Sequence, residues 1–291
     1  MSNALGIAVV DTMVAIPPAP ADESWRDQLR PLLKDRESLE GFAHPASYMF
    51  KNLPDARFAD DPVAAVLSEM DRFDVQHALV GVSAANEPGL QALRAHPDRL
   101  SGTVDVDPNR AMESVRELRQ AVEDWGVVAA ACFGAGTFPP RAYDDPAWFP
   151  IYAACVELGV PILLTVGIPG PRVPFTPQRV ECLDVVCYEF PELAVVMRHG
   201  AEPWVALAVK LMLKWPNLYY MPSAFAPKHY PQAIIDFANT RGADKIMYAG
   251  YYPMGQTLER IFTEMPNVPF RDHVWLMFLR ENALRVFKLD D

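Results

Sequence analysis

The stretch Leu193-Ala194-Val195-Val196-Met197-Arg198-His199-Gly200-Ala201 predicts a buried strand. Its apolar residues run without polar alternation, and a histidine and a glycine close the run. A strand without alternation is covered on both faces, as in a parallel sheet with helices outside. A helical pattern over 203–213 follows directly, so His199 is expected at the carboxyl end of a strand. Parallel α/β folds build their sites at that end.

The same strand and helix alternation extends over most of the chain. Other strands are predicted at 5–10, 76–82, 100–106, 127–132, 160–166, 217–221 and 244–249, with helices at 61–73, 87–95, 115–125, 146–158, 177–188, 230–240, 254–265 and 271–287. Eight such units in 291 residues predict a single α/β domain, a (β/α)8 TIM barrel. An open doubly wound sheet is the alternative. The glycines at 134 and 136 lack the spacing of a phosphate-binding loop.

Residues 17–61 form a long insertion after the first predicted strand, rich in proline and charge and with little periodicity. Long segments of this kind are usually functional lids, binding insertions or mobile loops. The insertion carries aromatic side chains that are costly to leave in water: Trp25, Phe42, Tyr48 and Phe50. We therefore expect it to cover the carboxyl face of the barrel or to form a subunit contact.

The composition narrows the class of protein. A net charge of −11 and a pI near 5.0 argue against a nucleic-acid partner, which needs a basic face. No apolar run approaches the ~20 residues of a membrane span, so no membrane partner is expected. The four cysteines match no zinc-site spacing, and we expect reduced thiols in a cytoplasmic protein.

Several fragments, in order along the chain, resemble motifs of one family. They are Met70 to Val75 ("MDEAGI"), Ala85-Asn86 with His96 to Leu100 and Val106 to Pro108 ("AN…HPDRF…DP"), Glu157 to Pro161 ("ELGLPV"), Phe190 to Gly200 ("FPDLKIVLAHGG"), Trp215 to Tyr219 ("PNVY") and Glu281 to Ala283 ("NA"). Together they resemble the amidohydrolase-related family, which includes aminocarboxymuconate semialdehyde decarboxylase, resorcylate-type decarboxylases and lactonases. The resemblance implies a TIM barrel, a small-molecule substrate and a homodimer.

The chain departs from this family at its metal ligands. The family's "DxHxH" is replaced by Asp11-Thr12-Met13-Val14-Ala15, and the histidine of its "HTG" by Thr165. The aspartate of its "GSDYP" is replaced by Tyr251 in Ala249-Gly250-Tyr251-Tyr252-Pro253, and only His199 remains. A transition metal needs about three N, O or S ligands from the protein. We therefore expect no metal and no cofactor.

Two residues are the candidate catalytic groups. His199 would transfer a proton or act as a neutral hydrogen-bond donor, and otherwise it is a histidine satisfied by a backbone carbonyl. Tyr251 would donate to negative charge developing on the substrate, and otherwise it fills the space of the missing metal.

Five further residues are candidates for substrate binding: Asp11, Thr165, Arg172, Tyr252 and His44. For Asp11 and Thr165 a structural role is equally favoured. Arg172 would clamp a carboxylate in two-pronged fashion, with plain surface exposure as the simpler account. Aromatic filling is preferred for Tyr252, and His44 would help to cover the pocket. Cys132 ends a strand but has no visible base beside it, which favours core packing.

Two functions remain open. The first is a metal-independent hydrolase or lyase, of decarboxylase, hydratase or lactonase type, acting on a small organic acid, lactone or aromatic metabolite. The second is a catalytically inactive barrel that binds a small molecule or acts as an interaction protein. A fold does not decide between them, because function depends on the site. Convergence of His199 and Tyr251 on open space favours the enzyme, whereas filling by Phe133, Trp148 and the tyrosines favours the inactive barrel.

Overall fold

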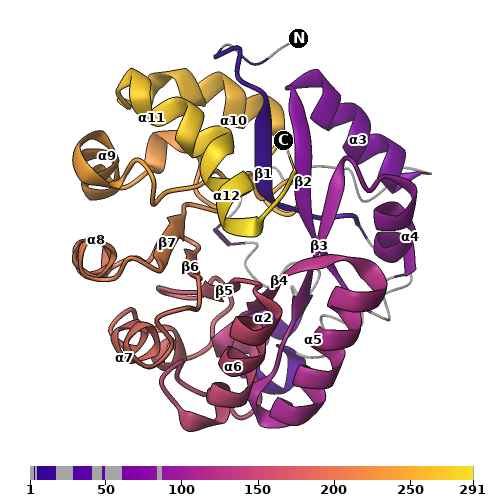
Figure 1. Ribbon diagram of the computed structural model, residues 1–291, viewed down its shortest axis with the longest axis vertical. Helices are drawn as coiled ribbons and strands as arrows, with labels where there is room; N and C mark the ends of the chain where they lie inside the picture. The colour runs from indigo at the N-terminus through magenta and orange to yellow at the C-terminus, as the bar shows by residue number, and fades with distance from the viewer. Residues whose placement is uncertain are drawn as a thin grey trace.

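The computed structural model describes residues 3, 5–17, 29–40, 48–49, 61–83 and 87–290. Seven parallel strands form one sheet in sequence order, and Figure 1 shows helices arranged around them. The strands are β1 (Val9–Val14), β2 (Val75–Val82), β3 (Leu100–Asp105), β4 (Val127–Cys132), β5 (Ile162–Thr165), β6 (Val195–Arg198) and β7 (Leu218–Met221). This is the expected α/β barrel architecture.

The α-helices follow the strands as the apolar patterns predict. They are α2 (Arg36–Glu40), α3 (Pro62–Arg72), α4 (Glu87–Ala95), α5 (Ala111–Trp125), α6 (Phe149–Leu158), α7 (Cys182–Glu189), α8 (Val205–Lys214), α9 (Gln232–Phe237), α10 (Leu258–Glu264), α11 (Asp272–Leu276) and α12 (Asn282–Phe287). At the start of α3, Asp61 accepts a hydrogen bond from Ala64 N at 2.9 Å, which caps the helix. A π-helical stretch, Met277–Glu281, joins α11 to α12.

The first strand begins later than the predicted range of 5–10. Gly6 has a positive φ of 62°, and the Asn3 side chain donates to Ile7 O and Phe73 O at 2.9 and 3.0 Å. These bonds hold the preceding residues in a turn, so β1 covers Val9–Val14 instead. As a result, Asp11 lies within the strand and not at its end.

The predicted eighth strand at 244–249 is not a regular strand, yet its segment closes the barrel. Tyr220 N donates to Lys245 O at 2.9 Å on the β7 side. On the β1 side, Thr12 N donates to Tyr248 O at 3.2 Å and Ala15 N to Tyr252 O at 2.9 Å. Residues 245–252, the closing segment, therefore bridge the first and last strands.

The buried apolar residues form two layers. The larger layer fills the space between the strands and the outer helices. The smaller fills the barrel interior, with Val10, Leu79, Ala129, Ala131, Leu163, Val196, Met221, Met247 and Ala249. Ala283, Val286 and Phe287 of α12 join this inner layer, and α12 lies across the strands in Figure 1. Apolar side chains thus fill the barrel interior toward the amino ends of the strands. The polar side chains that face the interior lie nearer the carboxyl ends of the strands.

Asp11 joins β1 to the closing segment from the outer side of the barrel wall. Its Oδ1 accepts hydrogen bonds from Met13 N at 3.0 Å and Gly250 N at 2.8 Å. A Cβ on Gly250 would collide with the Asp11 carboxylate and the Tyr248 hydroxyl, so this close approach requires glycine. Tyr248 packs against Phe262 and Phe278 in the outer layer. The structure therefore places Asp11 away from the barrel mouth, which favours its structural role over contact with substrate.

Burial raises the pKa of Asp11 to about 7, and the backbone bonds from Gly250 and Met13 oppose that rise only partly. The hydroxyl of buried Tyr248, beside the carboxylate, opposes the rise by a smaller amount. The pKa in the folded chain lies above the unfolded value of 3.8, so the folded state binds more protons between these values. Folding stability therefore falls as the pH rises through this window and levels off above pH ~7.

We predict that Asp11→Asn removes this loss, because the amide keeps the Oδ1 acceptor and carries no charge. The variant should gain up to about 4 kcal/mol over the parent at pH 8, and little at pH 4. Melting curves of both proteins at the two pH values measure the difference. Asp11→Ala, which loses the acceptor, should be less stable than Asp11→Asn at both. If the melting temperatures of the parent and of Asp11→Asn change equally between pH 4 and pH 8, the Asp11 carboxyl does not have a raised pKa in the folded protein.

Candidate functional site

His199 and Tyr251 meet at the carboxyl end of the barrel. His199 follows the last residue of β6, and Tyr251 lies in the closing segment, next to β1. Their ring centroids are 5.3 Å apart at an interplanar angle of 85°, an edge-to-face contact. The structure thus brings together the two residues expected to be catalytic.

Both residues have a backbone conformation that side chains other than glycine rarely adopt. The φ angle is 69° at His199 and 58° at Tyr251. Such left-handed residues cost energy and cluster at active sites and ligand clamps. Beside His199, a Cβ on Gly200 would collide with the Phe225 ring, so the chain turns tightly there. The turn directs both rings toward one region.

Ser223 fixes the orientation of the His199 ring. The Ser223 hydroxyl accepts from His199 N at 3.0 Å and also contacts Nδ1 at 3.0 Å. The Ser223 carbonyl oxygen lies 3.3 Å from Nδ1. Because a carbonyl oxygen can only accept, these contacts are satisfied when Nδ1 carries the proton. The lone pair of the neutral ring is then on Nε2.

The surroundings keep the His199 ring neutral. Although the residue is only half-buried, enclosing protein withholds bulk water, and this desolvation lowers its pKa to about 3. The charge of neighbouring Arg198 lowers the pKa further, while the bond to Ser223 opposes the shift. At neutral pH, His199 is therefore a hydrogen-bonding group and not an imidazolium acid.

Arg198 points into the barrel beside this pair. Residues two apart on a strand share a face, and Val196 belongs to the inner layer. Arg198 Nε donates to Thr165 Oγ1 at 2.8 Å, and the Thr165 carbonyl accepts from the Tyr143 hydroxyl at 2.6 Å. No described residue accepts a hydrogen bond from the Nη groups of Arg198. Thr165, a predicted substrate contact, thus holds an arginine that the sequence reasoning overlooked.

Asp105 is the second overlooked residue. It is the last residue of β3, and its neighbour Val104 belongs to the outer layer, so Asp105 faces the interior. Its side chain reaches solvent, but the surrounding protein raises its pKa, and the charge of Arg198 opposes that rise. The alternation of Ser101, Thr103 and Asp105 within an otherwise apolar strand was the sequence signal for it.

The other candidate residues lie elsewhere. Tyr252 is buried in the outer layer, and this burial, with a smaller effect from the charge of Glu69 on α3, raises its pKa. This position supports the packing role and not contact with substrate. Burial raises the pKa of the Cys132 thiol well above its usual range, which disfavours a nucleophilic thiolate. His44 lies outside the described residues.

Arg172 binds the long insertion. Its guanidinium pairs with Asp35 and Glu37, both at 2.9 Å, and lies 4.9 Å from the centre of the Tyr48 ring. The Tyr48 hydroxyl also donates to Gly170 O at 2.6 Å. These contacts attach the described part of the insertion to the loop after β5. They argue for a structural role of Arg172, and its clamping of a substrate stays a prediction, as does a lid function.

The bulky aromatic residues near the site pack behind it. Trp148 is fully buried, with its ring 5.5 Å from that of Tyr143 and 5.8 Å from that of Tyr152. The Tyr152 ring continues the cluster to Phe190 of the outer layer. Trp148 therefore stabilises the outer layer and does not fill the space beside His199.

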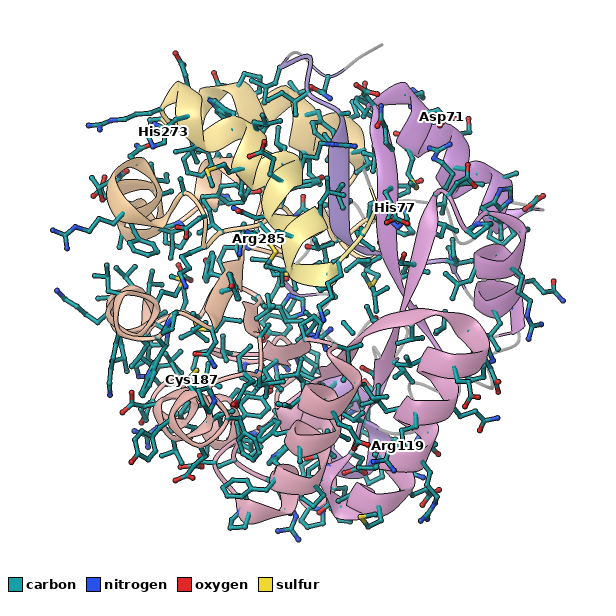
Figure 2. All side chains as sticks on the ribbon, viewed as in Figure 1. Asp71, His77, Arg119, Cys187, His273 and Arg285 are labelled. Atoms are coloured by element: carbon teal, nitrogen blue, oxygen red, sulfur yellow. The ribbon has the colours of Figure 1, made fainter. Side chains whose placement is uncertain are left out.

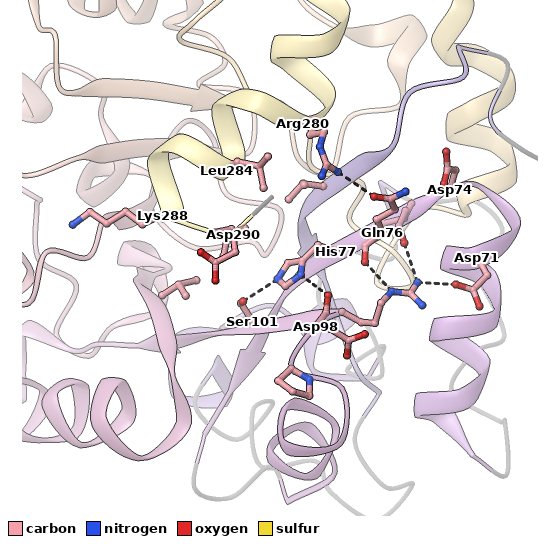
Figure 3. A pocket seen from close by; sticks show the side chains of 16 residues that line it. Asp71, Asp74, Gln76, His77, Asp98, Ser101, Arg280, Leu284, Lys288 and Asp290 are labelled. Atoms are coloured by element: carbon pink, nitrogen blue, oxygen red, sulfur yellow. Dashed lines mark hydrogen bonds and ion pairs between the residues drawn. The ribbon is translucent and has the colours of Figure 1, made fainter.

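A pocket of about 850 Å³ lies at the opposite, amino end of the strands (Figure 3). Its polar side chains are paired with one another: Arg99 donates to Asp71 at 2.7 Å, and His77 lies 2.8 Å from Ser101 Oγ. His77 lies on β2, whereas His273 lies on the outer helix α11 (Figure 2). Since His77 contacts Asp98 O and Ser101 Oγ, and Arg99 pairs with Asp71, these side chains have structural partners within the pocket.

Solved structures resemble the whole chain at low sequence identity. An uncharacterised TIM-barrel protein from Bordetella bronchiseptica is 21% identical, with a TM-score of 0.75 over 97% of this chain and 98% of that one. A 5-carboxyvanillate decarboxylase from Novosphingobium aromaticivorans, complexed with manganese and 4-hydroxy-3-methoxy-5-nitrobenzoic acid, is 17% identical, with a TM-score of 0.69 over 99% and 97%.

A probable 2-pyrone-4,6-dicarboxylic acid hydrolase from Acinetobacter baumannii, with citric acid bound, is also similar. It is 17% identical, with a TM-score of 0.62 over 97% of this chain and 100% of that one. No curated protein matches the sequence. At these identities the solved structures establish the fold alone.

The family profile described as amidohydrolase matches residues 19–289, nearly the entire chain. The match covers all strands from β2 onward, His199 and the closing segment. The chain therefore belongs to the amidohydrolase family.

Proposed function

We propose that this protein is a metal-independent hydrolase or lyase that acts on a small organic acid or lactone at the carboxyl end of the barrel. The edge-to-face contact of His199 and Tyr251 carries the proposal, because both residues hold strained left-handed conformations to make it. The similar decarboxylase and the similar hydrolase bear names that refer to carboxylic acids, which supports this substrate class.

Each group has a chemical role that fits its protonation state. Tyr251 keeps its proton because burial raises its pKa, so it can donate a hydrogen bond to a developing oxyanion. Neutral His199 accepts or relays a hydrogen bond through Nε2. Asp105, a solvent-accessible carboxyl with a raised pKa, is better suited to proton transfer than His199.

Asp105 can serve either type of reaction. In a decarboxylation, its protonated form would deliver a proton to the carbon that loses carbon dioxide. In a lactone hydrolysis, its ionised form would take a proton from the attacking water. The raised pKa makes both forms accessible nearer neutral pH than for an ordinary carboxyl.

The residues at the family's metal positions do not fit a metal. Met13, Ala15, Thr165 and Tyr251 occupy these positions, and among the described residues no three His, Cys, Asp or Glu side chains cluster. Within the same described ranges, no helix is long and apolar enough to cross a membrane. A cytoplasmic location and a homodimer stay predictions.

We predict that protein purified without chelator contains far less than one transition metal per chain. Elemental analysis by mass spectrometry measures the content directly. Prolonged chelator treatment should leave turnover unchanged. Near-equimolar zinc or manganese, lost together with activity, refutes metal independence.

We predict that a screen of aromatic carboxylic acids and lactones finds a substrate. Three variants should turn this substrate over more slowly than the parent. Tyr251→Phe and His199→Ala should each reduce kcat by ~10²–10³-fold through loss of hydrogen bonds to the reacting group. Asp105→Asn should reduce it by ~10²–10⁴-fold through loss of proton transfer. Melting temperatures should change little.

Tyr188→Phe is the matched control for Tyr251→Phe, because Tyr188 is an exposed tyrosine on α7. It should keep the parental kcat. If Tyr251→Phe also keeps it, the phenol has no role in the reaction. If no compound is turned over while several bind, the inactive binding barrel is the better account.

We predict that the His199 ring stays neutral from pH 5 to pH 8, because desolvation holds its pKa near 3. Proton–nitrogen NMR spectra of the histidine rings across this range follow its protonation. The resonance that disappears in His199→Asn identifies the ring. A titration midpoint between pH 5 and pH 7 rules out the enclosed, neutral histidine.

A further inference from the structure

We propose that Arg198 takes the place of the family's metal ion as the fixed positive charge of the site and binds the substrate's carboxylate through its two Nη groups. The assignment of this carboxylate to a substrate rests on the proposed function. The binding of a carboxylate at Arg198 does not depend on turnover.

The first argument is that Arg198 is held at one end only. Its Nε is fixed by Thr165 Oγ1 at 2.8 Å, and Thr165 is itself fixed through its carbonyl by the Tyr143 hydroxyl. The same hydroxyl accepts from Gly134 N at 3.1 Å, so the support extends into β4's loop. The guanidinium is thereby oriented before any ligand binds. Such preorganisation favours bidentate binding of a carboxylate.

The second argument is the absence of a partner at the other end. Within the described part of the chain, no acceptor bonds to the Nη groups of Arg198 and no carboxylate lies within ion-pair distance. By contrast, Arg99 in the amino-end pocket donates to Asp71 and to two backbone carbonyls. A charged group facing the interior without a partner is costly, and an anionic ligand would relieve that cost.

The third argument is that the charge of Arg198 acts on the other polar groups of the site, although desolvation has the larger effect on each. This charge shifts the pKa values of His199, the next residue along the chain, and of Asp105 on β3 and Tyr251 in the closing segment. A divalent cation among these groups would be repelled by the guanidinium. The same position attracts a carboxylate, so the site selects acids over neutral compounds of the same shape.

Thr165 links this arrangement to the missing metal site. It occupies the position of a histidine in the family's "HTG" motif, and here its hydroxyl accepts from Arg198 instead. The family motif at 190–200 has alanine where this chain has Arg198. At position 165, a metal-binding histidine of the family is thus replaced by a threonine whose hydroxyl accepts a hydrogen bond from Arg198.

Benzoate and its neutral counterpart benzamide test the proposal without knowledge of the substrate. Ligand-observed NMR titrations give both dissociation constants for the parent, Arg198→Met, Arg198→Lys and Arg116→Met. Arg116 is an exposed arginine on α5 and is the matched control. Circular dichroism melts verify that each variant is folded.

The parent should bind benzoate more tightly than benzamide. Arg198→Met should weaken benzoate binding by about 10- to 100-fold and leave benzamide binding little changed. Arg198→Lys, which keeps the charge but loses the fork, should lie between the two. Arg116→Met should match the parent.

Three results would overturn the proposal. They are undetectable binding of benzoate at millimolar concentrations, equal binding of benzoate by the parent and by folded Arg198 variants, and a tenfold gain in benzoate affinity when zinc or manganese is added. The proposed function has its own test. It is wrong if the Arg198 variants lose benzoate affinity as expected but the parent turns over no acid or lactone. Turnover of a neutral lactone that is undiminished in Arg198→Met keeps the function and removes Arg198 from it.

Discussion

The hydrogen bond from Gly250 N to Asp11 Oδ1, 2.8 Å long, ties the closing segment to β1, where the barrel has no regular eighth strand. Residues 245–252 have too few sheet contacts to form a strand, so a side chain supplements the backbone bonds there. Because Tyr251 follows Gly250, this bond also sets where the phenol ring lies. Asp11 therefore acts on the site from the far side of the wall, at the cost of a buried carboxylate.

The two ends of the barrel divide stability and reactivity between them. At the amino end, α12 seals the interior and charged side chains pair with one another. The carboxyl end carries half-buried His199, Tyr251 with its positive φ, Asp105 with its raised pKa, and Arg198, whose Nη groups have no acceptor among the described residues. This asymmetry is the usual pattern of TIM-barrel enzymes.

Much of the fold follows from apolar periodicity, because strands and helices alternate with clear breaks. The pattern failed at the first strand, where Asn3 and Gly6 impose a turn on an apolar run, and at the closing segment, where tertiary bonds replace regular pairing. In the candidate site, His199 and Tyr251 could be predicted because each lies at the carboxyl end of a predicted strand. Arg198 and Asp105 were missed because each was interpreted as part of a strand, and a strand's inward face depends on its register.

The contacts of Arg172 with Asp35, Glu37 and Tyr48 make the attachment of the insertion sensitive to ionic strength. Its ion pairs are exposed, so dissolved salt screens them strongly, whereas the Tyr48 hydroxyl bond to Gly170 is much less sensitive. Rising ionic strength therefore loosens one attachment and spares the other. The bond between the Tyr48 hydroxyl and Gly170 O is then the contact of this group that high salt leaves in place.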